Sequence, residues 1–393
     1  MNVIETLLII IAAVLLVPVL VLFTQVLLSV LFKLKPRQLI TRRPSIAVII
    51  PAHNEQVLIL STINSVLSQL NQGDRLIVVA DNCTDATASI ARTAGAEVVE
   101  RFNQQDRGKG YALDFGIRHC AENPPEVVII VDADCQVGAK SLYKLAAACI
   151  ESGRPVQSLY LMKSPEGAGL KTRIAEFAWL VKDQVRPSGY ALLGLPCQLM
   201  GTGMAFLWRD ISTANLASGH IVEDLQLGID FCRTGKPPLF LPEALVTSVF
   251  PLSTEGLSGQ RTRWEHGHLG VILSEAPGLF AEAIRKANLN LLALALDLIV
   301  PPLALLTLLC AAIFVISIIL YLTSGMTLAL WLASSCLALL GLAVMLAWAA
   351  FGRQVISLAS LCYAPIYALL KIPVYLNFLV KRQVSWVRSK RDE

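Results

Sequence analysis

The chain has 393 residues, of which 55% are hydrophobic and 16% are charged, whereas about 25% of the residues of an ordinary soluble domain are charged. This composition excludes a disordered protein and argues against a purely soluble one. The net charge of +4 does not favour a nucleic-acid-binding protein, which needs a dominant basic face. The 9 cysteines are scattered without a C-x-x-C pair, which fits neither a zinc site nor a disulfide framework and indicates a reducing compartment.

The first element is an apolar segment from Val3 to Phe32, with Glu5 and Gln25 as its only strongly polar residues. About 20 apolar residues suffice to cross a bilayer, so we expect residues 1–32 to form a transmembrane helix. A cleaved signal peptide would be shorter and would begin with basic residues. Basic residues follow at positions 33, 35, 37, 42 and 43, which predicts that this helix ends on the cytoplasmic side.

The next stretch, residues 33–290, alternates between strand and helix patterns and is expected to form a cytoplasmic domain. Helical patterns separate the apolar, β-branched runs, which predicts βαβ units on a mainly parallel sheet, an α/β fold. The predicted strands are 45–51, 75–80, 96–101 and 126–131, and the predicted helices are 54–70, 84–94 and 108–121.

Apolar sequence returns after residue 290 and predicts two transmembrane helices within 291–351, at 291–322 and 327–351. Residues 352–393 contain a last apolar stretch, 355–380, which is interrupted by two prolines and a lysine and is followed by a basic tail. A fourth crossing would place that tail outside, so a re-entrant or interfacial segment is favoured over a full span.

Two further features concern the membrane. Apolar residues recur at three- and four-residue spacing from Leu170 to Val185, with basic residues around them, which predicts an amphipathic helix. We favour an interfacial position for it over packing on the domain core. Asp297, inside the predicted 291–322 helix, is either a functional intramembrane carboxylate or a group solvated at the interface.

Polar residues follow the predicted strands, at the sheet edge where α/β proteins bind ligands. P-A-H-N-E follows the first strand, D-N-C-T-D the second, and Asp132-Ala133-Asp134 the fourth. Two carboxylates one residue apart can turn toward one Mg²⁺ or Mn²⁺ ion, although such a pair by itself is more often a solvated turn. No G-x-G-x-x-G follows the first strand, so a nicotinamide or flavin cofactor is poorly supported.

Six motifs occur together in one order, and they end in Q-R-T-R-W at 260–264. The others are P-A-H-N-E, D-N-C-T-D-A-T, R-G-K-G-Y-A-L, V-D-A-D and V-E-D. Over residues 45–270 this order resembles the membrane-bound, processive-type family-2 glycosyltransferases, which include cellulose, chitin-oligosaccharide and hyaluronan synthases and ceramide glucosyltransferases. The resemblance implies a GT-A-like nucleotide-sugar-binding domain and a hexosyltransferase-type activity.

The resemblance also implies residue roles. Ala52, Glu55 and Asp81 match positions that hold the uracil and ribose of a nucleotide sugar, and Lys109 matches a basic residue beside its diphosphate. Asp134 is the expected metal ligand, with Asp132 near the metal and the ribose. Asp224 matches the catalytic base. Gln260, Arg263 and Trp264 match the motif that closes over the diphosphate and the acceptor, so Gln260 and Arg263 are also expected to bind the donor.

The segment around Gly203 resembles the family's glycine-rich acceptor segment, but a glycine-bearing strand in the core explains it equally well. Asn82 and Cys83 depart from the family pattern, in which a second Asp and a Gly are common. This departure concerns the base and sugar preferences of the donor pocket.

These residues together predict an inverting, metal-dependent glycosyltransferase of the cell membrane. Its donor is a nucleotide sugar, with a UDP-sugar expected, and its acceptor is a membrane lipid or a glycan. A processive polysaccharide synthase remains an alternative, although few spans are available to enclose a channel. A non-catalytic nucleotide-sugar sensor or a transporter is the alternative of another class. The sequence does not indicate the oligomeric state.

Overall fold

The computed structural model of the protein describes residues 3–37, 42–219, 222–251, 254–325 and 327–380. These residues divide into two compact units. One, the sheet unit, comprises Lys35–Glu166 and Leu195–Gly267. The other, the helical unit, comprises the chain up to Leu34, Gly167–Gly194, and the chain from His268 onward.

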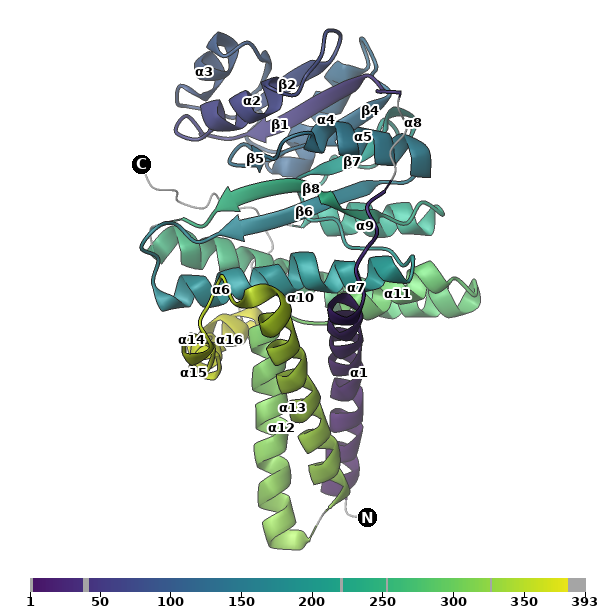
Figure 1. The fold of residues 1–393 in the computed structure, drawn as a ribbon, viewed down its shortest axis with the longest axis vertical. Coiled ribbons are helices and arrows are strands. Elements are labelled where there is room, and N and C mark those ends of the chain that lie inside the picture. Colours follow the sequence, from purple (N-terminus) through teal and green to yellow (C-terminus); the bar gives the residue numbers. More distant parts are fainter. Residues whose placement is uncertain (1–2, 38–41, 220–221, 252–253, 326, 381–393) are drawn as a thin grey trace. The chain divides into compact units, whose positions relative to one another are not determined.

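The sheet unit contains an eight-stranded mixed sheet with the order β3-β2-β1-β4-β7-β6-β8-β5 (Figure 1). Strands β1, β2, β3 and β4 are mutually parallel, while β7 is antiparallel to β4 and β6, and β8 is parallel to β6. The strands are β1 (Ile46–Ala52), β2 (Arg75–Asp81), β3 (Glu97–Arg101), β4 (Val127–Ile130), β5 (Gln136–Val137), β6 (Val156–Lys163), β7 (Met204–Leu207) and β8 (Leu239–Val249).

Helices connect and cover these strands: α2 (Ile59–Leu67), α3 (Thr87–Thr93), α4 (Lys109–Cys120), α5 (Ser141–Ser152), α8 (Trp208–Ile211) and α9 (Glu223–Arg233). One side of the core is formed by Ile49, Ile77 and Ile130 of the sheet with Leu113 of α4. The central strands carry nearly continuous apolar runs rich in Val and Ile, as is typical of strands buried on both faces. The predicted α/β class with a mainly parallel sheet is confirmed, and the four predicted strands agree with β1 to β4 to within a residue at each end.

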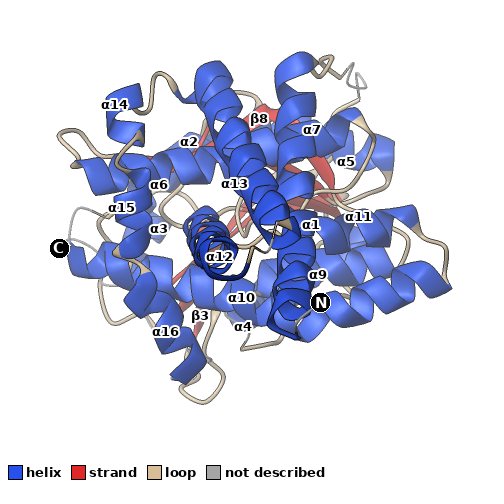
Figure 2. Ribbon diagram, turned by 90° about the horizontal axis from the view of Figure 1, so that it is seen from below, coloured by secondary structure: helices blue, strands red, loops and turns tan. Residues whose placement is uncertain are grey.

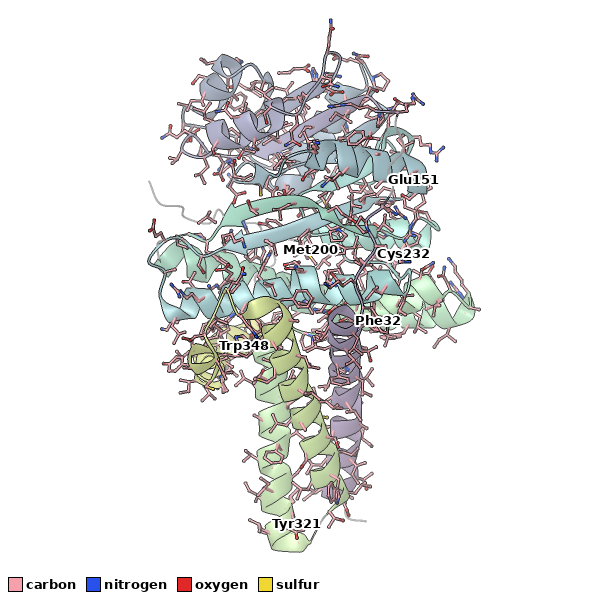
Figure 3. All side chains as sticks on the ribbon, viewed as in Figure 1. Phe32, Glu151, Met200, Cys232, Tyr321 and Trp348 are labelled. Carbon is pink, nitrogen blue, oxygen red and sulfur yellow. The ribbon has the colours of Figure 1, made fainter. Side chains whose placement is uncertain are left out.

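The helical unit is built around three long helices, α1 (Val3–Leu31), α12 (Leu303–Ser324) and α13 (Leu328–Ala347). They lie side by side in both views (Figures 1 and 2). Small residues such as Ala12, Cys310 and Ala333 are buried between them, which lets the helices approach closely. Side chains project from these helices along their whole length, with Tyr321 and Trp348 near opposite ends (Figure 3).

Shorter helices complete this unit. They are α6 (Leu170–Leu180), the π-helical turn Val181–Val185, α7 (Arg186–Leu192), α11 (Leu289–Leu298), a second π-helical turn Trp348–Gly352, α14 (Leu358–Leu361), α15 (Ala364–Leu369) and α16 (Ile372–Val380). Helix α10 (Thr254–Arg285) begins in the sheet unit and continues into the helical unit.

By length and composition, four described segments are long and apolar enough to cross a membrane, as expected of a membrane protein. They are Val3–Leu31, Leu303–Ser324, Leu328–Gly352 and Leu358–Val380. The last of them consists of the three short helices α14, α15 and α16, with Pro365 and Pro373 near the starts of the second and third. Its re-entrant or interfacial position stays a prediction.

The predicted helix 291–322 is interrupted in the structure. Helix α11 ends at Leu298 and α12 begins only at Leu303, because neither Pro301 nor Pro302 has an N–H to continue a helix. Asp297 therefore lies on α11 and not within the long helix α12. The predicted amphipathic helix is present as α6 and the π-helical turn, and its apolar residues Phe177 and Val185 are buried in the core of the helical unit.

Candidate active site

A lysine surrounded by carboxylates occupies the carboxyl edge of the central strands. Lys109, the first residue of α4, forms an ion pair with Asp132 and lies 3.8 Å from an oxygen of Glu223. Its ammonium also donates to the carbonyl of Gly201 at 2.6 Å. A Cβ placed on Gly201 would lie 3.1 Å from the Lys109 nitrogen and 3.2 Å from a carboxylate oxygen of Asp224. Lys109, Asp132, Glu223 and Asp224 are called the lysine cluster below.

The glycines of R-G-K-G-Y-A-L place this lysine. Gly108 has a φ of +131°, a backbone conformation that L side chains rarely adopt. A Cβ on Gly110 would lie 2.5 Å from the carbonyl oxygen of Leu216 and 2.7 Å from that of Ser218. The turn before α4 and the close approach of residues 216–218 both require glycine, and Lys109 is held between these two constraints.

Charge is shared within the lysine cluster. Burial lowers the pKa of Lys109, but the carboxylates of Asp132, Glu223 and Asp224 together raise it above its ordinary value. Burial raises the pKa of Glu223 to about 7, with Asp224 and Asp132 adding to the rise and Lys109 opposing it. The lysine therefore stays protonated at neutral pH and compensates part of the negative charge around it.

The two aspartates that follow β4 are hydrogen-bonded to Thr202, in the turn before β7, and to Ser248 of β8. The backbone N–H of Asp132 donates to the Thr202 hydroxyl at 3.0 Å. The Ser248 hydroxyl, on β8, donates to Oδ2 of Asp134 at 2.9 Å. Within the described residues no group of three or more His, Cys, Asp or Glu is arranged to hold a metal. Two carboxylates nevertheless fit Mg²⁺ or Mn²⁺, because these ions are commonly held by one or two carboxylates together with substrate phosphates.

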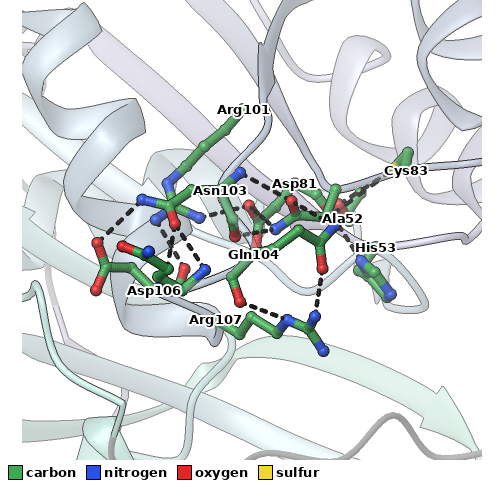
Figure 4. Close-up of polar contacts among 11 residues, drawn as sticks. Ala52, His53, Asp81, Cys83, Arg101, Asn103, Gln104, Asp106 and Arg107 are labelled. Atoms are coloured by element: carbon green, nitrogen blue, oxygen red, sulfur yellow. Dashed lines mark hydrogen bonds and ion pairs between the residues drawn. The ribbon is translucent and has the colours of Figure 1, made fainter.

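The neighbouring strand ends form a second polar group (Figure 4). Ala52 ends β1 and Asp81 ends β2, and these two strands pair in register. Asp81 accepts from Arg101 at 2.7 Å and from the side chain of Asn82 at 2.9 Å, both at Oδ1. Burial raises the pKa of Asp81, and the hydrogen bond from Arg101 opposes this rise.

Glu55 lies in the turn after β1, where its backbone N–H donates to the Thr87 hydroxyl at 2.8 Å. The carbonyl of Glu55 accepts from the N–H of Ile59 at the start of α2. The structure therefore brings Ala52, Glu55 and Asp81 to one edge of the sheet, as their places after strands predicted.

Gln260, Arg263 and Trp264 all lie on α10, in the part that belongs to the sheet unit. Gln260 is buried, and within the described part of the chain its side-chain oxygen has no hydrogen-bond partner. A buried amide oxygen without a partner is costly and is expected where a ligand completes the site.

Gly203 is buried beside β6 and β8. Its φ is +62°, and a Cβ there would lie 1.9 Å from the Ser158 hydroxyl. This packing gives a structural reason for the glycine, and its part in an acceptor site stays a prediction.

Sequence reasoning missed four residues that the structure places next to the expected ones: Glu223, Thr202, Ser248 and Arg101. Glu223 could have been suspected from the V-E-D motif. The other three come from segments whose neighbours are set only by tertiary pairing.

Comparison with known proteins gives two family matches. Residues 47–183 match the model of glycosyl transferase family 2, and residues 127–351 match that of glycosyl transferase family group 2. A probable glycosyltransferase of Bacillus subtilis, YdaM, is 27% identical over 256 residues, which cover 61% of this chain and 59% of the relative. The 4,4'-diaponeurosporenoate glycosyltransferase of Staphylococcus aureus is 36% identical over 105 residues, which cover 26% of this chain and 27% of that one.

A solved structure shares the fold along most of the chain. The mannosyltransferase PcManGT of Pyrobaculum calidifontis, in complex with GDP-Man and Mn²⁺, aligns with a TM-score of 0.56 at 17% identity. The alignment covers 96% of this chain and 99% of that one.

Proposed function

Because the chain belongs to glycosyl transferase family group 2, we propose that this enzyme is an inverting, metal-dependent glycosyltransferase of the cell membrane. The donor is a nucleotide sugar, with a UDP-sugar expected. The acceptor is a membrane lipid or a glycan at the cytoplasmic face. The observation that carries this proposal is the lysine cluster, which sets Asp132 and Asp224 around one lysine at the carboxyl edge of the sheet.

The proposed donor site follows the strand ends. Ala52, Glu55 and Asp81 bind the nucleoside. Lys109, Gln260 and Arg263 bind the diphosphate. Asp134 and Asp132 would hold Mg²⁺ or Mn²⁺, and the bound ion would supply positive charge that favours departure of the diphosphate. Arg263 acts at the same end, where negative charge develops during transfer.

The proposed acceptor side adjoins the donor site, because Asp224 belongs to the lysine cluster. Asp224 accepts the proton of the acceptor hydroxyl as that oxygen attacks the anomeric carbon. Trp264 offers an aromatic face to a sugar ring or an apolar acceptor, and Gly203 lies in the expected acceptor segment. One carboxylate base without a second nucleophile gives a single displacement, so an α-linked donor yields a β-linked product.

The decisive experiment measures release of nucleoside diphosphate from a panel of nucleotide sugars by purified protein in native membrane lipid. We expect Asp224→Asn to lower the rate by about 10²- to 10⁴-fold, as for loss of a general base, and Asp134→Ala to abolish transfer. Asp230→Asn, on the same helix as Asp224 but paired with Arg233, is the matched control and should retain activity. Full turnover in a folded Asp224→Asn or Asp134→Ala protein would contradict the proposal.

Removal of divalent metal gives an independent test. Chelation should stop transfer, and either Mn²⁺ or Mg²⁺ should restore it. Product length, measured by mass spectrometry with native membranes, separates single addition from processive synthesis. We expect single addition or short products, because few of the described helices could enclose a channel.

A further inference from the structure

Asp81 presents only one of its two carboxylate oxygens to a ligand. Its Oδ1 accepts two hydrogen bonds, from Nη1 of Arg101 at 2.7 Å and from Nδ2 of Asn82 at 2.9 Å. A carboxylate oxygen has two lone-pair sites, so Oδ1 is fully used. Oδ2 makes no hydrogen bond among the described residues, and it is not enclosed by them. Oδ2 is therefore the one oxygen of Asp81 that remains open to accept a hydrogen bond from a ligand.

Both donors to Oδ1 are held in place by further contacts, and those of Arg101 can be followed in Figure 4. Arg101 is only 9% exposed, and its Nη2 donates to the carbonyl of Asp106 at 2.8 Å. Its guanidinium also lies over the ring of Tyr111, 5.6 Å from the centroid. Because these contacts hold Arg101 in place, it is not free to leave Asp81 when a ligand arrives.

Asn82 is held equally firmly. Its backbone has a φ of 51°, and its N–H donates to the carbonyl of Arg101 at 2.7 Å. Its side chain accepts from the N–H of Asn103 at 2.9 Å and donates to the carbonyl of Asn103 at 3.0 Å. An aspartate in this position could accept from Asn103 but could not donate to Asp81.

The bases of nucleotide sugars differ in the hydrogen-bond donors that they present to such a carboxylate. Uracil presents a single N3–H between two carbonyl groups. Guanine presents N1–H and the exocyclic N2–H side by side and parallel, and a carboxylate accepts both in straight hydrogen bonds only when each N–H reaches a separate oxygen. A site with one open oxygen leaves one guanine N–H with at best a bent hydrogen bond in a largely buried place, which is unfavourable.

We infer that Arg101 and Asn82 set the base selectivity of the donor site, by leaving Asp81 one acceptor oxygen and so favouring uracil over guanine. This inference rests on the proposed function, in which Asp81 faces the base of the donor. Arg101 and Asn82 act as positioning residues, since they work through Asp81.

The test compares inosine diphosphate with guanosine diphosphate, because the two differ only in the exocyclic amine. Dissociation constants are measured by calorimetry on the full chain in detergent with Mn²⁺, with UDP alongside. For the unaltered protein we expect UDP to bind most tightly and GDP to bind about tenfold more weakly than IDP, as for one unsatisfied hydrogen bond. Equal or tighter binding of GDP would overturn the inference.

Asn82→Asp gives a second, independent measure. It restores one acceptor position on Oδ1 while keeping the contact with the Asn103 N–H, so the preference for IDP over GDP should fall severalfold. Asn54→Asp is the matched control, because Asn54 also has a positive φ of 55° near the same strand ends and hydrogen-bonds with Thr84. An unchanged preference in Asn82→Asp, or an equal change in Asn54→Asp, would contradict the role of Asn82.

Turnover separates this inference from the proposed function. If the protein transfers sugar from a GDP-sugar faster than from any UDP-sugar, the base selectivity is wrong and the glycosyltransferase proposal stands. If it transfers sugar from no nucleotide sugar, the proposed function itself fails.

Discussion

At the scale of single residues, the carboxylates at the sheet edge depend on partners that are distant in the sequence. Ser248 is 114 residues from Asp134, yet its hydroxyl donates to that carboxylate at 2.9 Å. A group that orients a metal ligand in this way commonly changes metal affinity by about 10- to 100-fold.

We therefore expect Ser248→Ala to weaken Mn²⁺ binding about tenfold in the presence of UDP. Electron paramagnetic resonance of free Mn²⁺ measures this without any turnover. Ser158→Ala is the matched control, because Ser158 is a buried strand serine whose hydroxyl has no partner among the described residues. Unchanged Mn²⁺ affinity in Ser248→Ala would show that the serine does not support the metal site.

The site could be predicted from the sequence only where its residues follow a strand directly. Asp81, Asp132 and Asp134 each come at the end of an apolar run, so local pattern brings them to one edge. Ser248 and Arg101 carry no such signal, because their contacts depend on which strands pair in the folded sheet. The ion pair of Lys109 with Asp132 could not be predicted from the sequence either, although the resemblance placed both residues near the nucleotide-sugar donor.

At the scale of elements, the sequence predicted β1 to β4 well, because each is a short β-branched run bounded by turn residues. It did not predict β6 and β8, and it offered a strand at β7 only as an alternative to an acceptor segment; these strands join the sheet with mixed directions. It also joined α11 and α12 into one helix, since hydropathy does not register the break that two prolines impose.

A buried histidine links two of these elements. His268 of α10 is hydrogen-bonded to the carbonyl of Leu298 at 3.1 Å. Burial, together with the positive charges of Lys182 and Arg186, lowers its pKa from 6.5 to about 3. The ring is therefore neutral in the folded protein over the physiological range and donates its Nε2–H to that carbonyl.

Acidification should destabilise the fold through His268. In the unfolded chain His268 is protonated near pH 6.5, whereas in the folded chain it stays neutral at that pH. Its contribution to the free energy of unfolding is therefore fully present above pH 6.5 and is lost progressively as the pH falls toward 3. In detergent, the unfolding temperature of His268→Gln should fall less between pH 7 and pH 5 than that of the unaltered protein. Identical slopes for the two proteins would rule out this linkage.

At the scale of the whole molecule, a buried polar group joins three separate stretches of the chain within the helical unit. Arg186 of α7 donates to Oδ1 of Asp297 at 2.8 Å and to its carbonyl at 2.7 Å. Gln25 of α1 donates to the same carboxylate at 2.6 Å. Both members of the ion pair are buried, at 5% and 7% exposure. If any one of the three stretches were absent, the remaining buried polar side chains would lack a hydrogen-bond partner.

Removal of one charge should therefore cost more than removal of both. We expect Asp297→Leu or Arg186→Met alone to destabilise the protein by about 3–5 kcal/mol, as for a broken buried pair. The double variant should be destabilised less than either single variant, and therefore by much less than the sum of the two. Chemical unfolding in detergent micelles provides the double-mutant cycle, and simple additivity would show that the pair is not coupled.

The path of the chain also determines how the enzyme can be dissected. The sheet unit is left at Glu166 and re-entered at Leu195, so trimming both termini would not release it as a water-soluble fragment. The retained insertion would expose Ile174, Phe177 and Val185, which are buried in the core of the helical unit in the intact protein. A crystallisable soluble version therefore needs an internal deletion of residues 167–194, closed by a short linker, in addition to shortened ends.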